Sequence, residues 1–184
     1  MEELLYKRNE PYILSFVAAC SNSGKTTLIE KLIPLLQSKG YKIGALKHSA
    51  HKIEIDQEGK DSLRFSMAGA EQVIIASKEK IGMIRALREE LELKQILKLF
   101  SNIDIIIIEG YHNNEYPKIE VHRKSVCNRL LYESNACGGI ISIASDENLK
   151  TDCEVLDIND EDCIAEWIAK KAEEFFKSQS RSHS

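Results

Sequence analysis

Several features that would point to common classes of function are missing from this sequence of 184 residues. Basic residues are not in excess, because 25 lysines and arginines stand against 29 aspartates and glutamates and the net charge is −4. A protein that mainly binds nucleic acid needs cations to neutralise phosphates, so this balance argues against nucleic acid as the main partner. An anionic ligand would have to be held by a local site.

Export and membrane signals are also missing. The N-terminus, Met-Glu-Glu-Leu-Leu-Tyr, lacks the basic start and the long apolar run of a signal peptide. The longest purely apolar run, residues 105–108, is far too short to span a bilayer. We therefore expect no membrane association and a cytoplasmic location.

The cysteines show no metal-binding or redox spacing. There are five cysteines and no C-x-x-C pair. Their odd number favours free thiols in a reducing compartment. The five are Cys20, Cys127, Cys137, Cys153 and Cys163. Internal repeats and domain linkers are missing too, so we expect one domain over residues 1–177 and a disordered polar tail over 178–184.

What the sequence does contain is a phosphate-binding loop. The pattern A-x-x-x-x-G-K-T runs from Ala19 to Thr26. A short apolar strand, 12–17, precedes it, and apolar residues at helical spacing follow it over 26–39. Strand, turn and helix in this order are the context that such a motif requires. The plain alternative is a Ser/Gly turn before an ordinary helix.

The residue types in this loop suit a bound triphosphate. Consecutive backbone N–H groups and the start of the following helix can hold an anion. Lys25 can place its charge on the outer phosphates, the Thr26 hydroxyl can coordinate Mg²⁺, and Gly24 leaves room for the ligand. We expect the ligand to be held by Ser21, Asn22, Ser23, Gly24, Lys25, Thr26 and Thr27.

The order of the predicted elements indicates an α/β fold. The first strand, the helix over 26–39 and a strand over 41–47 make a βαβ unit, which predicts a parallel sheet. Pro34 should kink the helix and Gly40 should end it. Further strands are predicted at 72–77, 80–86, 103–108, 119–122, 139–144 and 154–158, and further helices at 62–68, 88–100 and 160–177. The class is therefore a mostly parallel central sheet with flanking helices in three layers.

Acidic residues near the loop predict a Mg²⁺ site. The β-branched strand over 103–108 delivers Glu109 to the metal, in the manner of a Walker B acid. The loop 48–61 follows the second strand and offers Asp56 as a metal ligand and Asp61 as a catalytic residue that orients water. The alternative is that both carboxylates are simply solvated charges on the loop. His48 and His51 have ligand-like spacing, but a zinc site would need further ligands.

Short motifs elsewhere in the chain accompany the phosphate loop. They are residues 21–34, Lys47-His48, Gly59-Lys-Asp-Ser62, Ala68-Gly-Ala70, Ile108-Glu-Gly110 and Pro117-Lys-Ile-Glu-Val-His-Arg123. Over roughly residues 12–170 this combination resembles the molybdopterin-guanine dinucleotide biosynthesis protein B (MobB) family. Two positions depart from the family pattern, because Ala19 stands where glycine is usual and Glu58 where proline is common.

The resemblance implies a P-loop NTPase fold and a GTP-binding protein of bacterial molybdenum cofactor biosynthesis. Family members are dimers with weak GTPase activity that assist the guanylyltransferase MobA, which attaches GMP to molybdopterin. The implied ligands are GTP and Mg²⁺, the implied partners are MobA and a second copy of the chain, and molybdopterin or its guanine dinucleotide is a further candidate ligand. By position, residues 21–27 hold phosphates and Mg²⁺, and Glu109 lies near the metal.

The residue that selects guanine is not evident, because no N-K-x-D motif is present. Asp146, after a late strand, is the best candidate to accept hydrogen bonds from the base, with a turn residue as the plain alternative. No general base or arginine finger stands out, which fits slow hydrolysis. A small-metabolite kinase with a lid built on Arg123 or Arg129 is the alternative function. A third is a non-hydrolysing module in which nucleotide gates contacts of the segment 111–123.

Overall fold

The computed structural model describes residues 10–49, 60–134 and 136–181. The chain forms two compact units where the sequence predicts one domain. The first unit comprises Met1–His48 and Phe100–Ser184, and the second comprises Ser49–Leu99. Each unit is described by itself.

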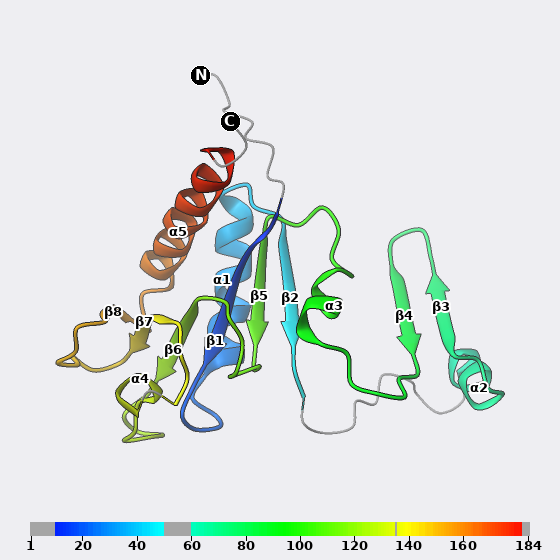
Figure 1. Cartoon of the computed structure of the whole chain (residues 1–184), viewed down its shortest axis with the longest axis horizontal. Helices are drawn as coiled ribbons and strands as arrows, with labels where there is room; N and C mark the ends of the chain where they lie inside the picture. Colours follow the sequence, from blue (N-terminus) through cyan, green and yellow to red (C-terminus); the bar gives the residue numbers. More distant parts are fainter. Residues whose placement is uncertain (1–9, 50–59, 135, 182–184) are drawn as a thin grey trace. The chain divides into compact units, whose positions relative to one another are not determined.

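The first unit is built on a six-stranded sheet in the order β2-β5-β1-β6-β7-β8 (Figure 1). Every pairing between neighbouring strands is parallel. The strands are β1 (Tyr12–Val17), β2 (Ile43–Lys47), β5 (Ile105–Glu109), β6 (Lys118–His122), β7 (Ile140–Ser145) and β8 (Glu154–Asp157). The predicted α/β class with a mostly parallel central sheet is therefore confirmed. All strands end at the same edge of the sheet, where their following loops meet.

Two long helices, α1 (Lys25–Ser38) and α5 (Glu161–Arg181), pack side by side and cover the hydrophobic core (Figure 1). Helix α1 runs unbroken through Pro34 and ends as predicted at Gly40, whose φ is 87° and whose N–H donates to the carbonyl of Gln37 at 2.9 Å. The core they cover includes Leu14, Phe16, Ile107, Leu32, Leu36, Ile164 and Ile168.

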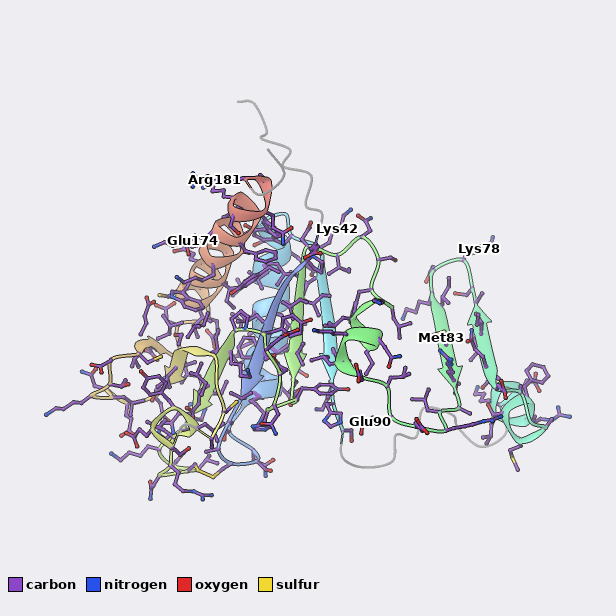
Figure 2. The ribbon with its side chains drawn as sticks, viewed as in Figure 1. Lys42, Lys78, Met83, Glu90, Glu174 and Arg181 are labelled. Carbon is purple, nitrogen blue, oxygen red and sulfur yellow. A yellow bond between two sulfur atoms is a disulfide. The ribbon has the colours of Figure 1, made fainter. Side chains whose placement is uncertain are left out.

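Helix α5 is longer than the sequence predicts, because it continues to Arg181 (Figure 2). Residues 178–181 are therefore helical where a disordered tail over 178–184 is predicted. The hydroxyls of Ser178 and Ser180 donate to the carbonyls of Phe175 at 2.7 Å and Phe176 at 3.1 Å. The burial of Phe176 in the core holds this end of the helix in place.

Alternation along β6 places buried polar groups on one face of the sheet. Ile119 and Val121 belong to the core under the helices. Lys118, Glu120 and His122 alternate with them and therefore lie on the opposite face, although all three are buried. The carboxylate of Glu120 accepts the backbone N–H groups of Leu131 at 2.7 Å and Tyr132 at 2.9 Å, which fixes the start of the short helix α4 (Leu131–Ser134).

The second unit holds an antiparallel hairpin of β3 (Gln72–Ala76) and β4 (Ile81–Arg85), with α2 (Asp61–Met67) before it and α3 (Leu93–Leu97) after it. Both predicted strands are present. Helix α3 is shorter than the predicted 88–100, because Glu92 is extended and forms a capping box with Gln95.

Candidate functional site

The phosphate loop, residues 18–24, connects β1 to α1 at the edge where the parallel strands end. Asn22 and Gly24 have φ values of 61° and 87°, and such left-handed residues let consecutive N–H groups converge on an anion. Within the described residues, positive φ outside glycine occurs at Asn22, Asn102 and Tyr111, so Ala19 keeps the negative φ that allows alanine there. The buried Ser23 braces the loop, since its hydroxyl donates to the carbonyl of Cys20 at 2.7 Å.

Three side chains meet beside this loop. The hydroxyl of Thr26, in the first turn of α1, donates to Oε1 of Glu109 at 2.7 Å. The Lys47 ammonium lies 3.4 Å from Oε2 of Glu109 and 3.4 Å from Oγ1 of Thr26. Lys47 and Glu109 end the paired strands β2 and β5 and are register partners. The structure brings Thr26 and Glu109 together, as the sequence suggests. The contact of Lys47 with both residues is not predicted from the sequence.

The donor set at this point fits Mg²⁺. A threonine hydroxyl and a carboxylate are hard oxygen ligands, and here they already touch. Among the residues that the structure describes, no group of three His, Cys, Asp or Glu side chains could hold a metal alone. An ion beside Thr26 and Glu109 would therefore complete its shell with oxygens from phosphate and water. The metal role of both residues stays a prediction.

The charges around Lys25 change the titration of their neighbours. Burial lowers the pKa of Lys25, and although the Glu109 carboxylate opposes this effect, the Lys47 ammonium adds to it. Burial also lowers the pKa of His112, and the charges of Lys25 and Lys118 lower it further. These effects favour the neutral form of the His112 imidazole, and no pattern in the sequence points to this.

A tight turn fixes the ends of β2 and β5. Gly110 has a φ of 96°, and a Cβ there would lie 3.1 Å from the Cβ of His48. The N–H of His48 donates to the carbonyl of Glu109 at 2.9 Å, and its ring stacks on Tyr111 with centroids 4.1 Å apart. The turn thus holds Lys47 and Glu109 in place. Of the other residues predicted from this region, His51 and Asp56 lie outside the described residues.

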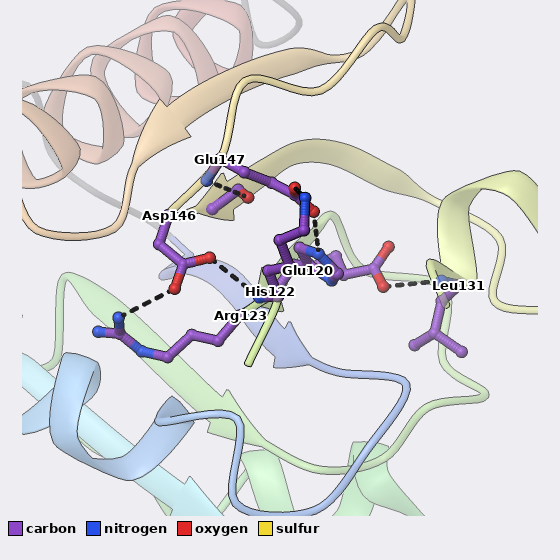
Figure 3. A network of polar contacts seen from close by, with 8 residues as sticks. Glu120, His122, Arg123, Leu131, Asp146 and Glu147 are labelled. Atoms are coloured by element: carbon purple, nitrogen blue, oxygen red, sulfur yellow. Dashed lines mark hydrogen bonds and ion pairs between the residues drawn. The ribbon is translucent and has the colours of Figure 1, made fainter. Parts of the chain in front are cut away.

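Two further predicted site residues are engaged elsewhere. Asp61 begins α2 in the second unit, and its exposed carboxylate pairs with Arg64 at 3.1 Å. Asp146 follows β7, accepts the backbone N–H of Lys124 at 3.0 Å and lies 3.6 Å from the Arg123 guanidinium (Figure 3). The catalytic role of Asp61 and the guanine-selecting role of Asp146 both stay predictions.

A disulfide joins the phosphate loop to the turn after β6. Cys20 and Cys127 are bonded, with their Cα atoms 6.0 Å apart. The prediction of free thiols is therefore wrong for these two residues, while Cys137, Cys153 and Cys163 are free. The two bonded cysteines are 107 positions apart and meet because β1 and β6 are neighbouring parallel strands.

Reducing this disulfide should destabilise the protein. A cross-link over this sequence separation restricts the unfolded chain, so we expect dithiothreitol to lower the free energy of unfolding by about 2–3 kcal/mol. The measurement is urea unfolding with and without reductant. Cys127→Ser should lose this response and the exposed Cys163→Ser should keep it. An equal response in Cys127→Ser and the wild type would contradict the role given to the bond.

Comparisons with known proteins agree with this geometry. The family model described as molybdopterin guanine dinucleotide synthesis protein B matches residues 13–146. The molybdopterin-guanine dinucleotide biosynthesis adapter protein of Escherichia coli is 36% identical over 170 residues, covering 86% of this chain and 94% of that protein. The adapter protein of the same name from Haemophilus influenzae is 32% identical over 168 residues, covering 90% and 92%.

Solved structures show the same fold. A crystal structure described as molybdopterin-guanine biosynthesis protein B superposes with a TM-score of 0.71 at 30% identity, over 88% of this chain and 99% of that one. The Bacillus subtilis MobB structure gives a TM-score of 0.68 at 23% identity and shows the fold alone. The chain thus belongs to the molybdopterin guanine dinucleotide synthesis protein B (MobB) family, whose model matches residues 13–146.

Proposed function

We propose that this chain is an adapter protein of molybdopterin-guanine dinucleotide biosynthesis that binds GTP and Mg²⁺ at its phosphate loop. The pathway comes from relatives that this chain matches over 92% or more of their length. The observation that carries the nucleotide site is the 2.7 Å hydrogen bond between Thr26 and Glu109, which places two oxygen ligands beside Lys25.

The described residues would act by positioning charge. The N–H groups of the loop would cradle the phosphates, and Lys25 would neutralise the outer ones. Thr26 and Glu109 would hold Mg²⁺, which when bound supplies further positive charge against the phosphates. None of the described residues beside the loop orients an attacking water, and positioning charge alone gives only part of the acceleration, so we expect slow GTP hydrolysis. Asp61 as a catalytic residue and Asp56 as a metal ligand stay predictions.

Partners and location are part of the same proposal. The chain would act in the cytoplasm as a homodimer, together with the guanylyltransferase MobA, and the pterin or its guanine dinucleotide is a further candidate ligand. Among the described ranges, none of the helices could span a bilayer. In the reducing cytoplasm the Cys20–Cys127 bond persists only if it resists the glutathione pool.

Calorimetric titration tests the nucleotide site. We expect GTP to bind more tightly with Mg²⁺ than with EDTA, and more tightly than ATP under both conditions. Binding of neither nucleotide would overturn the proposal. Rapid phosphoryl transfer from ATP to a small metabolite would instead favour the kinase alternative, which the names of the relatives do not support.

Glu109→Gln tests the metal ligands separately from the phosphate loop. The amide keeps the size of the side chain and can still accept from the Thr26 hydroxyl, but it lacks the charge that attracts Mg²⁺. We expect GTP affinity in Mg²⁺ to fall about 10-fold, which corresponds to about 1.4 kcal/mol. Affinity in EDTA should not fall, since no metal is bound there. If Mg²⁺ raised the GTP affinity of the variant as much as that of the wild type, Glu109 would not be a metal ligand.

A further inference from the structure

Arg123 lies against the phosphate loop, although nearly one hundred residues separate them in the sequence. It directly follows β6, which pairs in parallel with β1, so the segments after both strands meet at the same edge of the sheet. A Cβ placed on Gly24 would lie 3.4 Å from Nε of Arg123. The guanidinium therefore reaches Gly24, the last residue before Lys25 and helix α1.

The guanidinium keeps donors available for a ligand. Its side chain is 34% exposed, and its one ion pair within the described residues is the 3.6 Å contact with Asp146. That distance is too long for a hydrogen bond, and among the described residues the guanidinium donates none. Arginine has five N–H donors in a planar fork that matches the oxygens of a phosphate group.

The turn that carries Arg123 is fastened at several points. The carbonyl of Arg123 accepts the N–H groups of Val126 at 2.9 Å and Cys127 at 3.0 Å. Cys127 is in turn bonded to Cys20 of the phosphate loop. Asp146 accepts the N–H of Lys124 at 3.0 Å, so the same carboxylate that faces the guanidinium also fixes the backbone beside it. A side chain anchored in this way is preorganised for a ligand in the loop.

We propose that Arg123 is a phosphate-binding residue of the nucleotide site, with Asp146 as its positioning residue. This inference rests on the proposed function and adds a cation that approaches the phosphates from the β6 side, whereas Lys47 and Glu109 approach from β2 and β5. Arg123 contacts the phosphates and not the base. The sequence suggests an arginine of this kind only for the kinase alternative, whose lid would use Arg123 or Arg129.

The test compares Mg²⁺-GTP with Mg²⁺-tripolyphosphate, an inorganic probe that has no base. Arg123→Gln should weaken the binding of both by about 10–50-fold, because a charge-assisted contact is lost. Arg123→Lys should lose less affinity, since a point charge remains without the fork. Arg181→Gln, at an exposed position in the last turn of α5, is the matched control and should bind both probes as the wild type does.

Asp146→Asn separates the positioning role from base selection. If Asp146 orients Arg123, the substitution weakens GTP, ATP and tripolyphosphate by the same few-fold factor. A loss confined to GTP would instead show that Asp146 reads guanine, and would overturn its positioning role. Thermal unfolding of each variant shows whether it is folded. If Arg123→Gln does not fold, Arg123→Lys still tests the role of the arginine.

Several results would overturn the role of Arg123. If the Arg123→Gln variant bound both probes like the wild type, the arginine would be only a structural partner of Asp146. Loss of GTP binding with unchanged tripolyphosphate binding would place the arginine at the base. If the wild type bound tripolyphosphate through Arg123 but bound no GTP, the proposed function would fail while this inference stood. Wild-type protein that bound neither probe would overturn both.

Discussion

Lys25→Ala is expected to lower the affinity for Mg²⁺-GTP by about 100-fold or more, which corresponds to about 2.8 kcal/mol. Lys25 begins helix α1 directly after Gly24, and its partial burial beside Glu109 and Lys47 places the ammonium in the site. A bond between two charged groups contributes more than a neutral one, and alanine leaves the phosphates without this partner. Calorimetric titration measures the change.

Lys39→Ala is the matched control. Lys39 caps the opposite end of the same helix, and its ammonium lies 3.7 Å from Glu166 in a surface ion pair. Such pairs contribute little, so neither nucleotide affinity nor stability should change measurably. Nucleotide affinity that fell equally in both variants would mean that the loop is not the binding site.

Lys118→Met is expected to reduce the free energy of unfolding by about 3–5 kcal/mol. The Lys118 side chain is inaccessible to solvent, and its ammonium donates to the carbonyls of Asn114 at 2.6 Å, Tyr116 at 3.1 Å and Gly138 at 2.7 Å. Methionine has a similar volume but no donor, so three carbonyls lose a charged partner while packing changes little. Urea unfolding measures the loss.

Lys124→Met provides the comparison for that measurement. Lys124 lies on the same segment of chain, but its side chain is exposed and pairs with Glu147 at 2.8 Å. We expect little change in its free energy of unfolding. A Lys118→Met protein as stable as Lys124→Met would mean that the buried ammonium contributes nothing beyond its volume.

The parts of the site that the sequence predicts are those that follow one another along the chain. The strand over 12–17, the loop and the helix after it are local features, and their bounds differ from the structure by at most a residue at each end. Glu109 is predicted because a buried strand ending in an acid is itself a local pattern. The role of an element can thus be predicted where one short segment contains the whole signal.

The contributions of Lys47, Arg123 and Cys127 could not be predicted in the same way. Each reaches the phosphate loop only because β2, β5, β1 and β6 are neighbours in that order, and the strand order is a property of the whole sheet. Lys47 did have one usable sign, since it ends a predicted strand at the edge where ligands bind. Cys127 lies in an irregular turn, and no sequence pattern places that turn near Cys20.

The positions of the buried polar residues follow from the alternation of β6. The sequence predicts a strand over 119–122 but indicates no role for the residues between its apolar positions. In the structure Glu120 caps helix α4 and His122 lies 3.0 Å from Glu147. These partners lie 11 to 25 residues away along the chain, so only the folded structure reveals them.

A crystal structure with Mg²⁺ and a non-hydrolysable GTP analogue tests the nucleotide site most directly. The account predicts the triphosphate against the N–H groups of the loop 18–24, with Lys25 on the outer phosphates. It also predicts Mg²⁺ on the Thr26 hydroxyl, with Glu109 bound directly or through water. A nucleotide bound elsewhere, or a metal that contacts neither Thr26 nor Glu109, would contradict it.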